Sequence, residues 1–383
     1  MQKYNKTCFI SFFLIIIFFI LILGAMFYIK DPLQVWHKSF FGEPTYSYTI
    51  RESARAIIRD YDFNSVIIGN SLSENTSAAK ASEILSGGGN FDRVKFFNLS
   101  ISGSTTCEKK IILDYLLKNK DIKQVIYFLD ENYRSQSIEN KKYPIKSYDV
   151  IYNNNPYDDF KIYMNDKYFK CIIEFSNSED CIGKKRNMDK PYAWDDKEKY
   201  LKRFGGFENW IKNRDDDQIK DVFKEIKSTP KAINYEELPS DYISKSHDYI
   251  NRYLYSVIKK NKNTKFYIII PPVSDIELSM YLRSEKQRFK KYSDMLKYLV
   301  KTNKDHKNVE LYAFDDIENI GNIKLYKDRI HFNTDINYFI LNSIAKKEHL
   351  LTEDNINEYL KKVEEKAKKV DFDYYYDSVK QLI

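Results

Sequence analysis

A serine just after a short apolar run is the first candidate for chemistry. Val66–Ile68 is β-branched, which is typical of a buried parallel strand, and the run ends at Gly69. Glycine permits a sharp turn, so Ser71 is expected at the carboxyl end of the strand. A helix is predicted from about Ser77 to Leu85, which places Ser71 near a helix N-terminus, where backbone N–H groups stabilise a developing anion. An ordinary strand-to-helix turn with a capping serine explains the same residues.

An acid and a histidine lie close together far along the chain, where Asp328 precedes His331 by three residues. On a turn, this spacing lets the carboxylate accept the imidazole Nδ1–H, which fixes the tautomer and leaves Nε2 to face a nucleophile. A helix N-terminal aspartate beside a surface histidine is the alternative. The remaining histidines lie mostly in segments typical of connectors or charged helices, and they are His37, His247, His306 and His349.

A parallel sheet is predicted to position these residues. Strand-like and helix-like segments alternate along the chain, which indicates βαβ units and the α/β class, as a parallel-sheet α/β/α sandwich. After the first strand, the predicted strands are Val94–Ile101, Gln124–Leu129, Lys265–Ile270 and Val309–Phe314, and helices are predicted at Ile50–Tyr61, Cys107–Lys118, Ser244–Lys260 and Ser284–Lys301.

The order of these motifs resembles the SGNH (GDSL-like) hydrolase superfamily of serine esterases and acyl transferases. Gly69-Asn70-Ser71 matches the family's Gly-Asp-Ser-like turn, with asparagine in place of aspartate. Asn98-Leu99-Ser100-Ile101-Ser102-Gly103 matches the second block, and Asp328 with His331 matches the last. The resemblance covers about residues 60–135 and 262–345. It implies that Ser71 is the nucleophile, His331 the general base and Asp328 its orienting acid.

The resemblance also implies an oxyanion hole formed by the N–H groups of Ser71 and Gly103. The family's third block usually supplies an asparagine from Gly-x-Asn-Asp, whereas this chain has Asp130-Glu131-Asn132 after the third strand. Asn132 is the candidate for that place. Ser73 is a rival nucleophile, but the distance of Ser71 from the strand end suits a nucleophile elbow better.

The first residues predict a membrane anchor. Residues 8–29 carry no charge, and about 20 apolar residues in a helix cross the hydrocarbon core. Lys3 and Lys6 precede the run, which favours a cytoplasmic amino terminus and an extracytoplasmic domain. A cleaved signal peptide is the alternative, since Gly24-Ala25 offers small residues. However, the run is longer than a usual signal-peptide core, so an uncleaved anchor is favoured.

The cysteines indicate the cellular compartment, and the charge pattern indicates which classes of binding partner to expect. Cys171 and Cys181 flank a short polar loop and are predicted to form a disulfide in an oxidising compartment, with two unpaired buried thiols as the alternative. The sequence has no C-x-x-C pair or His-rich run, so no metal or other cofactor is predicted. The net charge of +7 is spread as alternating Lys and Asp/Glu, which indicates a solvated surface rather than a nucleic-acid site.

The predicted domain ranges follow from these features. Residues 1–29 form the cytoplasmic tip and anchor, 30–50 a juxtamembrane connector, 51–350 the SGNH-like domain, and 351–383 a helical tail. An insertion at about 134–243 has the size of a lid or substrate-binding subdomain. Its aromatic residues suit either stacking on sugar faces or a small core of their own.

These features together predict a membrane-anchored serine esterase or O-acyltransferase acting on acyl esters, acetyl esters first, of a cell-envelope polysaccharide. The alternative keeps the fold without catalysis, as a scaffold or glycan-binding partner of a membrane acyltransferase. A phosphoryl-transfer enzyme is a weaker third hypothesis, because the sequence has no P-loop and no credible metal-carboxylate cluster.

Overall fold

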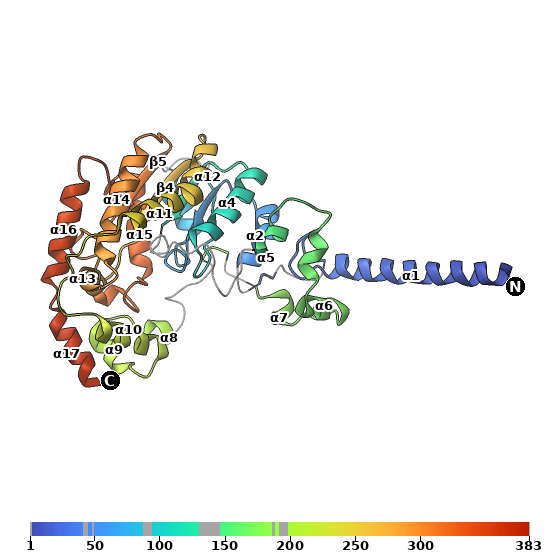
Figure 1. Cartoon of the computed structure of the whole chain (residues 1–383), viewed down its shortest axis with the longest axis horizontal. Helices are drawn as coiled ribbons and strands as arrows, with labels where there is room; N and C mark the ends of the chain where they lie inside the picture. The colour runs from blue at the N-terminus through green and yellow to red at the C-terminus, as the bar shows by residue number, and fades with distance from the viewer. Residues whose placement is uncertain are drawn as a thin grey trace. The chain divides into compact units, whose positions relative to one another are not determined.

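The computed structural model describes residues 2–40, 45–47, 50–86, 94–129, 146–185, 188–190 and 198–382. The chain forms two compact units, which are described separately (Figure 1). The N-terminal unit combines Met1–Tyr61 with Tyr143–Arg186, and the sheet unit combines Asp62–Lys142 with Asn187–Ile383.

A parallel sheet organises the sheet unit. The strands are hydrogen-bonded in the order β2-β1-β3-β4-β5, which is a doubly wound arrangement with ligand sites expected at the carboxyl edge. The predicted α/β fold class is therefore confirmed. The strands are β1 (Ser65–Ile68), β2 (Phe96–Asn98), β3 (Gln124–Phe128), β4 (Lys265–Ile270) and β5 (Val309–Ala313).

The second strand is shorter than the predicted Val94–Ile101. Only Phe96–Asn98 pairs as β2, with Phe96 opposite Ser65. Beyond Asn98, the backbone N–H groups of Leu99 and Ile101 still donate to the carbonyls of Ile67 and Gly69 at 2.8 and 2.9 Å. The chain after β2 therefore stays beside β1 up to the turn that contains Gly103.

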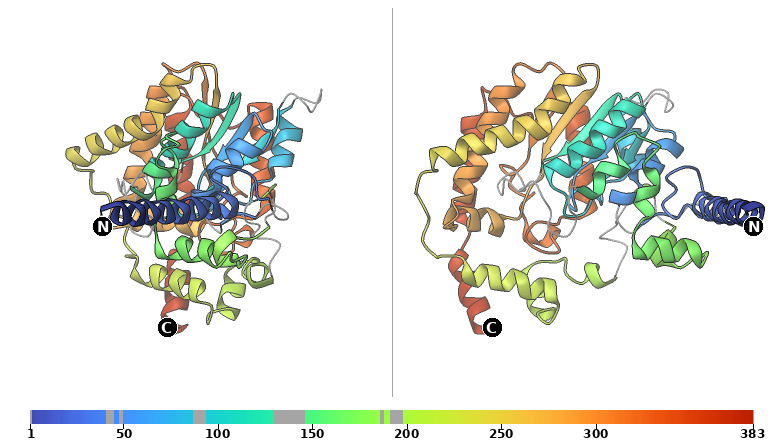
Figure 2. Two further views of the ribbon diagram at one scale, coloured as in Figure 1. Left: turned by 90° about the vertical axis from the view of Figure 1, so that its right-hand side faces the viewer. Right: turned by 45° about the vertical axis from the view of Figure 1, so that its right-hand side comes forward.

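Helices cover both faces of the sheet (Figure 2). On one face, α3 (Ala78–Leu85) and α15 (Thr334–Lys346) pack in a core that includes Ile67, Ile126 and Ile269. The second layer consists of helices that contact one another in succession. These are α4 (Thr106–Asn119), α11 (Ser240–Ile250), the π-helical turn η4 (Asn251–Tyr255), α12 (Ser256–Lys260) and α14 (Arg288–Asn303).

A further group of helices forms a satellite core around Trp210, Phe223 and Phe372. In this group α10 contacts α17, and α13 contacts α16. The helices of this core are α9 (Phe207–Lys212), α10 (Asp217–Ser228), α13 (Asp275–Arg283) and α17 (Phe372–Leu382). Ile323 of the 3₁₀ turn η5 (Ile323–Leu325) packs against the core, α16 (Ile356–Lys369) adjoins α13, and the short α8 (Glu198–Leu201) precedes α9 in the sequence.

The N-terminal unit begins with the long helix α1 (Gln2–Lys30). Its segment Cys8–Lys30 has a mean hydropathy of 3.1 and is long and apolar enough to span a membrane. The unit also contains α2 (Ile50–Asp60), α5 (Lys146–Ile151), the 3₁₀ helix η3 (Asp159–Tyr163), α6 (Asp166–Ile173) and α7 (Glu179–Ile182).

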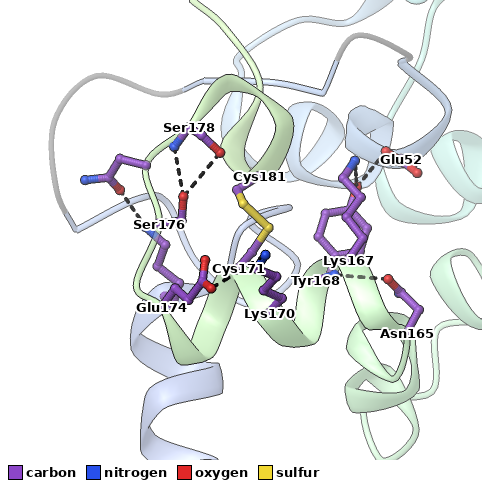
Figure 3. The surroundings of a disulfide bond; sticks show 12 residues. Glu52, Asn165, Lys167, Tyr168, Lys170, Cys171, Glu174, Ser176, Ser178 and Cys181 are labelled. Carbon is purple, nitrogen blue, oxygen red and sulfur yellow. Dashed lines mark hydrogen bonds and ion pairs between the residues drawn. A yellow bond between two sulfur atoms is a disulfide. The ribbon is translucent and has the colours of Figure 1, made fainter.

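A disulfide joins α6 to α7. Cys171 and Cys181 are bonded with their Cα atoms 5.6 Å apart (Figure 3). Cys8 is a free, exposed cysteine, and Cys107 is free and buried. The disulfide is the pair that the sequence analysis singled out.

The grouping of residues differs from the predicted domain ranges. Helix α2 belongs to the N-terminal unit rather than to the α/β domain, and the predicted insertion at 134–243 is divided between the two units. The predicted tail at 351–383 lies in the sheet unit, where Val363 and Val379 are fully buried. Sequence periodicity reports local faces of helices, not which distant segments they pack against.

Candidate active site

Ser71, His331 and Asp328 lie within hydrogen-bonding distance of one another in series. Ser71 Oγ is 2.9 Å from His331 Nε2, and His331 Nδ1 is 2.9 and 2.8 Å from the two carboxylate oxygens of Asp328. An ionised carboxylate only accepts hydrogen bonds, so Nδ1 carries the proton and Nε2 accepts from the serine hydroxyl. This is the arrangement in which a histidine acts as base toward a serine.

A tight turn between two paired residues sets the Asp328–His331 geometry. Tyr326 and Phe332 form an antiparallel bridge, and the Lys327 N–H donates to the His331 carbonyl at 3.0 Å. Within this turn, Asp328 Oδ1 accepts the backbone N–H groups of Ile330 and His331 at 3.0 and 2.9 Å. The aspartate thus shapes its own loop as an Asx turn, which is why the three-residue spacing brings carboxylate and imidazole together.

Successive turns hold Ser71 after β1. The side chain of Asn70 accepts the Leu72 N–H at 2.9 Å, and the Ser73 N–H donates to the Asn70 carbonyl at 3.1 Å. Helix α3 begins at Ala78, within one residue of the predicted start, and Ser77 is its N-cap. The residues beside Ser71 in the chain are therefore turn residues rather than the first turn of α3.

Ser73 occupies a structural position. Its side chain is buried, donates to the Asn70 carbonyl at 2.9 Å, and lies 2.7 Å from Ser100 Oγ. Gly69 is required by close packing here, since a Cβ would lie 2.2 Å from Ser73 Oγ and 2.7 Å from Phe128 Cβ. The structure places Ser73 beside Ser100, in the segment after β2, and it places Ser71 beside the histidine.

The segment after β2 braces the same turn. The side-chain amide of Asn98 donates to the backbone carbonyls of Ser73 and Thr76 at 2.9 and 2.8 Å, and its Oδ1 accepts the Ser100 N–H at 2.9 Å. Gly103 follows with φ +62, and among the described residues no heavy atom beyond its chain neighbours lies within 4 Å of the place where its Cβ would be. A glycine suits this left-handed conformation, and the space beside it is open.

A buried lysine adjoins the acid of the series. Lys327 is 1% exposed, and its Nζ lies 2.9 Å from Asp328 Oδ2. The ring of Tyr200 covers the ammonium at 5.4 Å. A buried charge is tolerated when it is paired, so Lys327 and Asp328 stabilise each other and fix the carboxylate. Sequence reasoning gave Lys327 no role, because a lysine beside an aspartate is ordinary on a protein surface.

The pKa values of the histidine and the acid shift downward. Burial penalises the imidazolium and lowers the pKa of His331, while nearby Asp328 opposes that effect and Lys327 adds to it. Although burial alone would raise it, the pKa of Asp328 lies well below its usual value because of His331 and Lys327. At neutral pH the histidine is therefore neutral and the aspartate ionised, as a general base and its orienting acid require.

Arg329 anchors the loop on its other side. Its guanidinium pairs with Glu277 of α13 and with Glu225 of α10, and its carbonyl accepts the side chain of Ser274 at 2.7 Å. Because Ser274 is the N-cap of α13, this hydrogen bond attaches the loop that carries His331 to the start of that helix. Sequence reasoning missed both Arg329 and the helix that holds it.

Asn132, the candidate third oxyanion donor, lies outside the described residues. Within the described ranges, no group of three or more His, Cys, Asp or Glu side chains is arranged to hold a metal ion. In the part of the chain that the structure describes, the candidate site comprises Ser71, His331 and Asp328, together with the backbone N–H groups of Ser71 and Gly103 expected to bind an oxyanion.

Comparisons with known proteins add little to this site. No protein-family model and no curated protein matches the sequence. A solved structure described as "a putative platelet activating factor from Streptococcus pneumonia" is 13% identical, covers 78% of this chain and 89% of that chain, and has a TM-score of 0.37. A TM-score this low carries no argument, so fold and site rest on the sheet topology and the distances given above.

Proposed function

We propose that this chain is a membrane-anchored serine esterase or O-acyltransferase of the SGNH type, acting on acyl esters of a cell-envelope glycan. The observation that carries the proposal is the series of 2.9 and 2.8 Å contacts from Ser71 through His331 to Asp328. Acetyl esters are the first substrates to test. The elbow, the glycine after the second strand and the Asp-x-x-His turn also occur in the order of the SGNH family.

The proposed reaction is acyl transfer through an ester on Ser71. Ser71 Oγ attacks the acyl carbonyl carbon while His331 Nε2 takes the hydroxyl proton, and Asp328 balances the imidazolium. The N–H groups of Ser71 and Gly103 stabilise the oxyanion, each such donor contributing about 3–4 kcal/mol. His331 then returns the proton to the departing alcohol. Water or a glycan hydroxyl, deprotonated by His331, releases the acyl group and restores the serine.

The location belongs to the same proposal. Helix α1 anchors the chain, and Lys3 and Lys6 ahead of it favour a cytoplasmic amino terminus. The Cys171–Cys181 disulfide suits an oxidising compartment on the far side of the membrane. An enzyme anchored there meets acylated glycans of the cell envelope, which motivates the substrate class.

Replacement of the serine tests the chemistry. We expect Ser71→Ala to lower acetyl-ester turnover by the full catalytic factor, on the order of 10⁴-fold or more. Ser73→Ala is the matched control and should keep turnover within about tenfold, because Ser73 contacts the backbone rather than His331. Unchanged turnover in Ser71→Ala would reject Ser71 as the nucleophile, whereas absence of turnover in the unaltered protein would favour the catalytically inactive scaffold.

The glycan assignment needs its own measurement. In cells that carry Ser71→Ala in place of the natural residue, the ester content of the envelope glycan should change, rising for a hydrolase and falling for a transferase. Unaltered ester content, together with loss of small-ester turnover in the same variant, would retain the enzyme and reject the glycan.

A further inference from the structure

Helix α6 of the N-terminal unit exposes a row of large apolar side chains. Phe169 and Ile173 are 42% and 45% exposed, and Phe175, just after the helix, is 41% exposed. Phe169 and Ile173 are four residues apart, so they lie on one side of the helix. Exposed apolar surface of this kind indicates a partner that covers it.

A second exposed side of α6 is polar, with Lys167, Lys170 and Glu174 exposed. Between the two sides, Tyr168 and Ile172 are buried in a cluster with Phe27 of α1. The apolar part of α6 is therefore divided between a strip packed on α1 and a neighbouring strip that stays exposed. Such a helix, with a charged side and an apolar side, suits a membrane interface.

The packing of α6 on α1 fixes the level of α6 relative to the membrane that α1 would span. Helix α6 contacts α1, and Phe169 packs edge-to-face on Phe27 with ring centroids 6.0 Å apart. Leu23 and Met26 also pack against the cluster. At 1.5 Å per residue, Leu23 lies about 10 Å before Lys30 along the axis, so the covered positions belong to the last turns of the apolar segment Cys8–Lys30.

The length of the apolar segment of α1 leaves little freedom in where the bilayer lies along the helix. From Cys8 to Phe27 the helix supplies about 20 residues, the number needed to cross the hydrocarbon core. Lys6 stands ahead of this segment, so shifting the span toward the amino terminus would draw a charge into the membrane. A span of that length ends where α6 packs on α1.

The residues that follow α1 have the composition of a membrane interface. Tyr28 is 52% exposed and stacks on Trp36 with centroids 6.1 Å apart, while Lys30 lies 5.3 Å from the ring centroid of Phe175 and donates to Asn177. Tyrosine and tryptophan favour the level of the lipid headgroups, and lysine ends there reach toward phosphate.

We propose that α6 is a membrane-interface helix, with Phe169, Ile173 and Phe175 inserted at the headgroup–acyl boundary of the phospholipid bilayer that α1 spans. The Cys171–Cys181 bond closes the segment behind this helix and ties α6 to α7 (Figure 3). The N-terminal unit would thus be seated on the membrane rather than tethered above it. The inference rests on the proposed membrane location of α1.

Photo-crosslinking in the full-length protein tests this seating. The benzophenone amino acid p-benzoylphenylalanine replaces one residue at a time, as Ile16→p-benzoylphenylalanine in the span, Phe169→p-benzoylphenylalanine on the apolar side of α6, or Lys167→p-benzoylphenylalanine on its polar side. The protein is reconstituted in vesicles of phosphatidylethanolamine and phosphatidylglycerol, and lipid adducts are measured by mass spectrometry. Non-reducing electrophoresis confirms that each variant keeps the disulfide and hence the folded unit.

We expect lipid adducts at positions 16 and 169, with at least a fivefold lower yield at 167. An adduct at 16 but none at 169 would overturn the seating of α6 while leaving the anchor intact. Equal yields at 167 and 169 would also overturn it, as would capture of a protein instead of lipid at 169. Absence of lipid at position 16 would remove the anchor itself, and the seating with it.

Discussion

Two histidine–carboxylate pairs in the sheet unit invite comparison. His331 Nδ1 is 2.8 Å from Asp328, and His247 Nε2 is 3.0 Å from Asp294. Their exposure is similar, at 17% for the side chain of His331 and 24% for that of His247. Among the described residues, the two pairs differ in that Nε2 of His331 is 2.9 Å from the hydroxyl of a candidate nucleophile, Ser71 Oγ.

The surroundings of the two pairs explain the difference. His247 and Asp294 project from helices α11 and α14, and the imidazole stacks on Tyr298 with centroids 3.7 Å apart. Asp328 instead sits in a loop at the carboxyl edge of the sheet, where it accepts two backbone N–H groups and pairs with buried Lys327. A histidine–aspartate pair is therefore a candidate catalytic pair when a rigid loop fixes its geometry and a nucleophile, here Ser71, lies within hydrogen-bonding distance of the imidazole.

The largest contrast is expected when each acid is changed to its amide. In Asp328→Asn, the amide can donate to Nδ1 and stabilise the tautomer with the proton on Nε2, which can no longer accept from Ser71. We expect kcat for acetyl-ester hydrolysis to fall on the order of 10⁴-fold. Asp294→Asn is the matched control and should change kcat less than twofold. Similar losses in both variants would contradict the distinction drawn between the pairs.

A smaller effect is expected from removing the lysine beside the acid. Lys327→Met leaves the Asp328 carboxylate without its buried cationic partner, which should cost about 1–3 kcal/mol of transition-state stabilisation, roughly 5- to 150-fold in kcat/KM. Lys324→Met removes an exposed lysine of the same loop region and serves as the control. A purely structural role would leave the pH profile of Lys327→Met unchanged.

The direction of the pH shift follows from the charges around His331. Burial lowers the pKa of His331, and Lys327 lowers it further. In the unaltered protein His331 should therefore stay neutral and active at pH values below about 6.5, the usual pKa of a histidine. Removing the Lys327 charge raises the pKa of His331 and moves the acidic limb of the kcat/KM profile to higher pH. A limb that moves to lower pH would contradict this assignment.

The smallest effect is expected at the second histidine. His247→Gln removes a partly exposed pair and a ring contact between α11 and α14, which should cost no more than about 1 kcal/mol in the free energy of unfolding. Ester turnover should stay within twofold of the unaltered protein. Circular dichroism checks that the variant stays folded. A large loss of turnover in a folded variant would give His247 a role that its position does not suggest.

Local sequence signals were enough for the strands and for the two halves of the site. The apolar runs at Val66–Ile68 and Lys265–Ile270 are short, β-branched and bounded by breakers, so the strands are found where predicted. Gly69 and the Asp328–His331 spacing act through adjacent backbone, which is why sequence alone located the turns that hold Ser71 and His331.

Features that depend on distant packing escaped prediction. Helix α13, at Asp275–Arg283, follows two prolines and is buried on nearly every side, so it shows no clear apolar face to recognise. The importance of Lys327 and Arg329 depends on Tyr200, Glu225 and Glu277, which lie 52 or more positions away in sequence. Such partners become visible only once the chain has folded.

The central claim is that His331 activates Ser71, and a serine-directed fluorophosphonate probe tests it most directly. Peptide mapping by mass spectrometry should find the adduct on Ser71 in the unaltered protein and in Ser73→Ala, and the labelling rate should fall at least 100-fold in His331→Ala. Labelling on Ser73, or labelling of Ser71 at an unchanged rate in His331→Ala, would contradict the account.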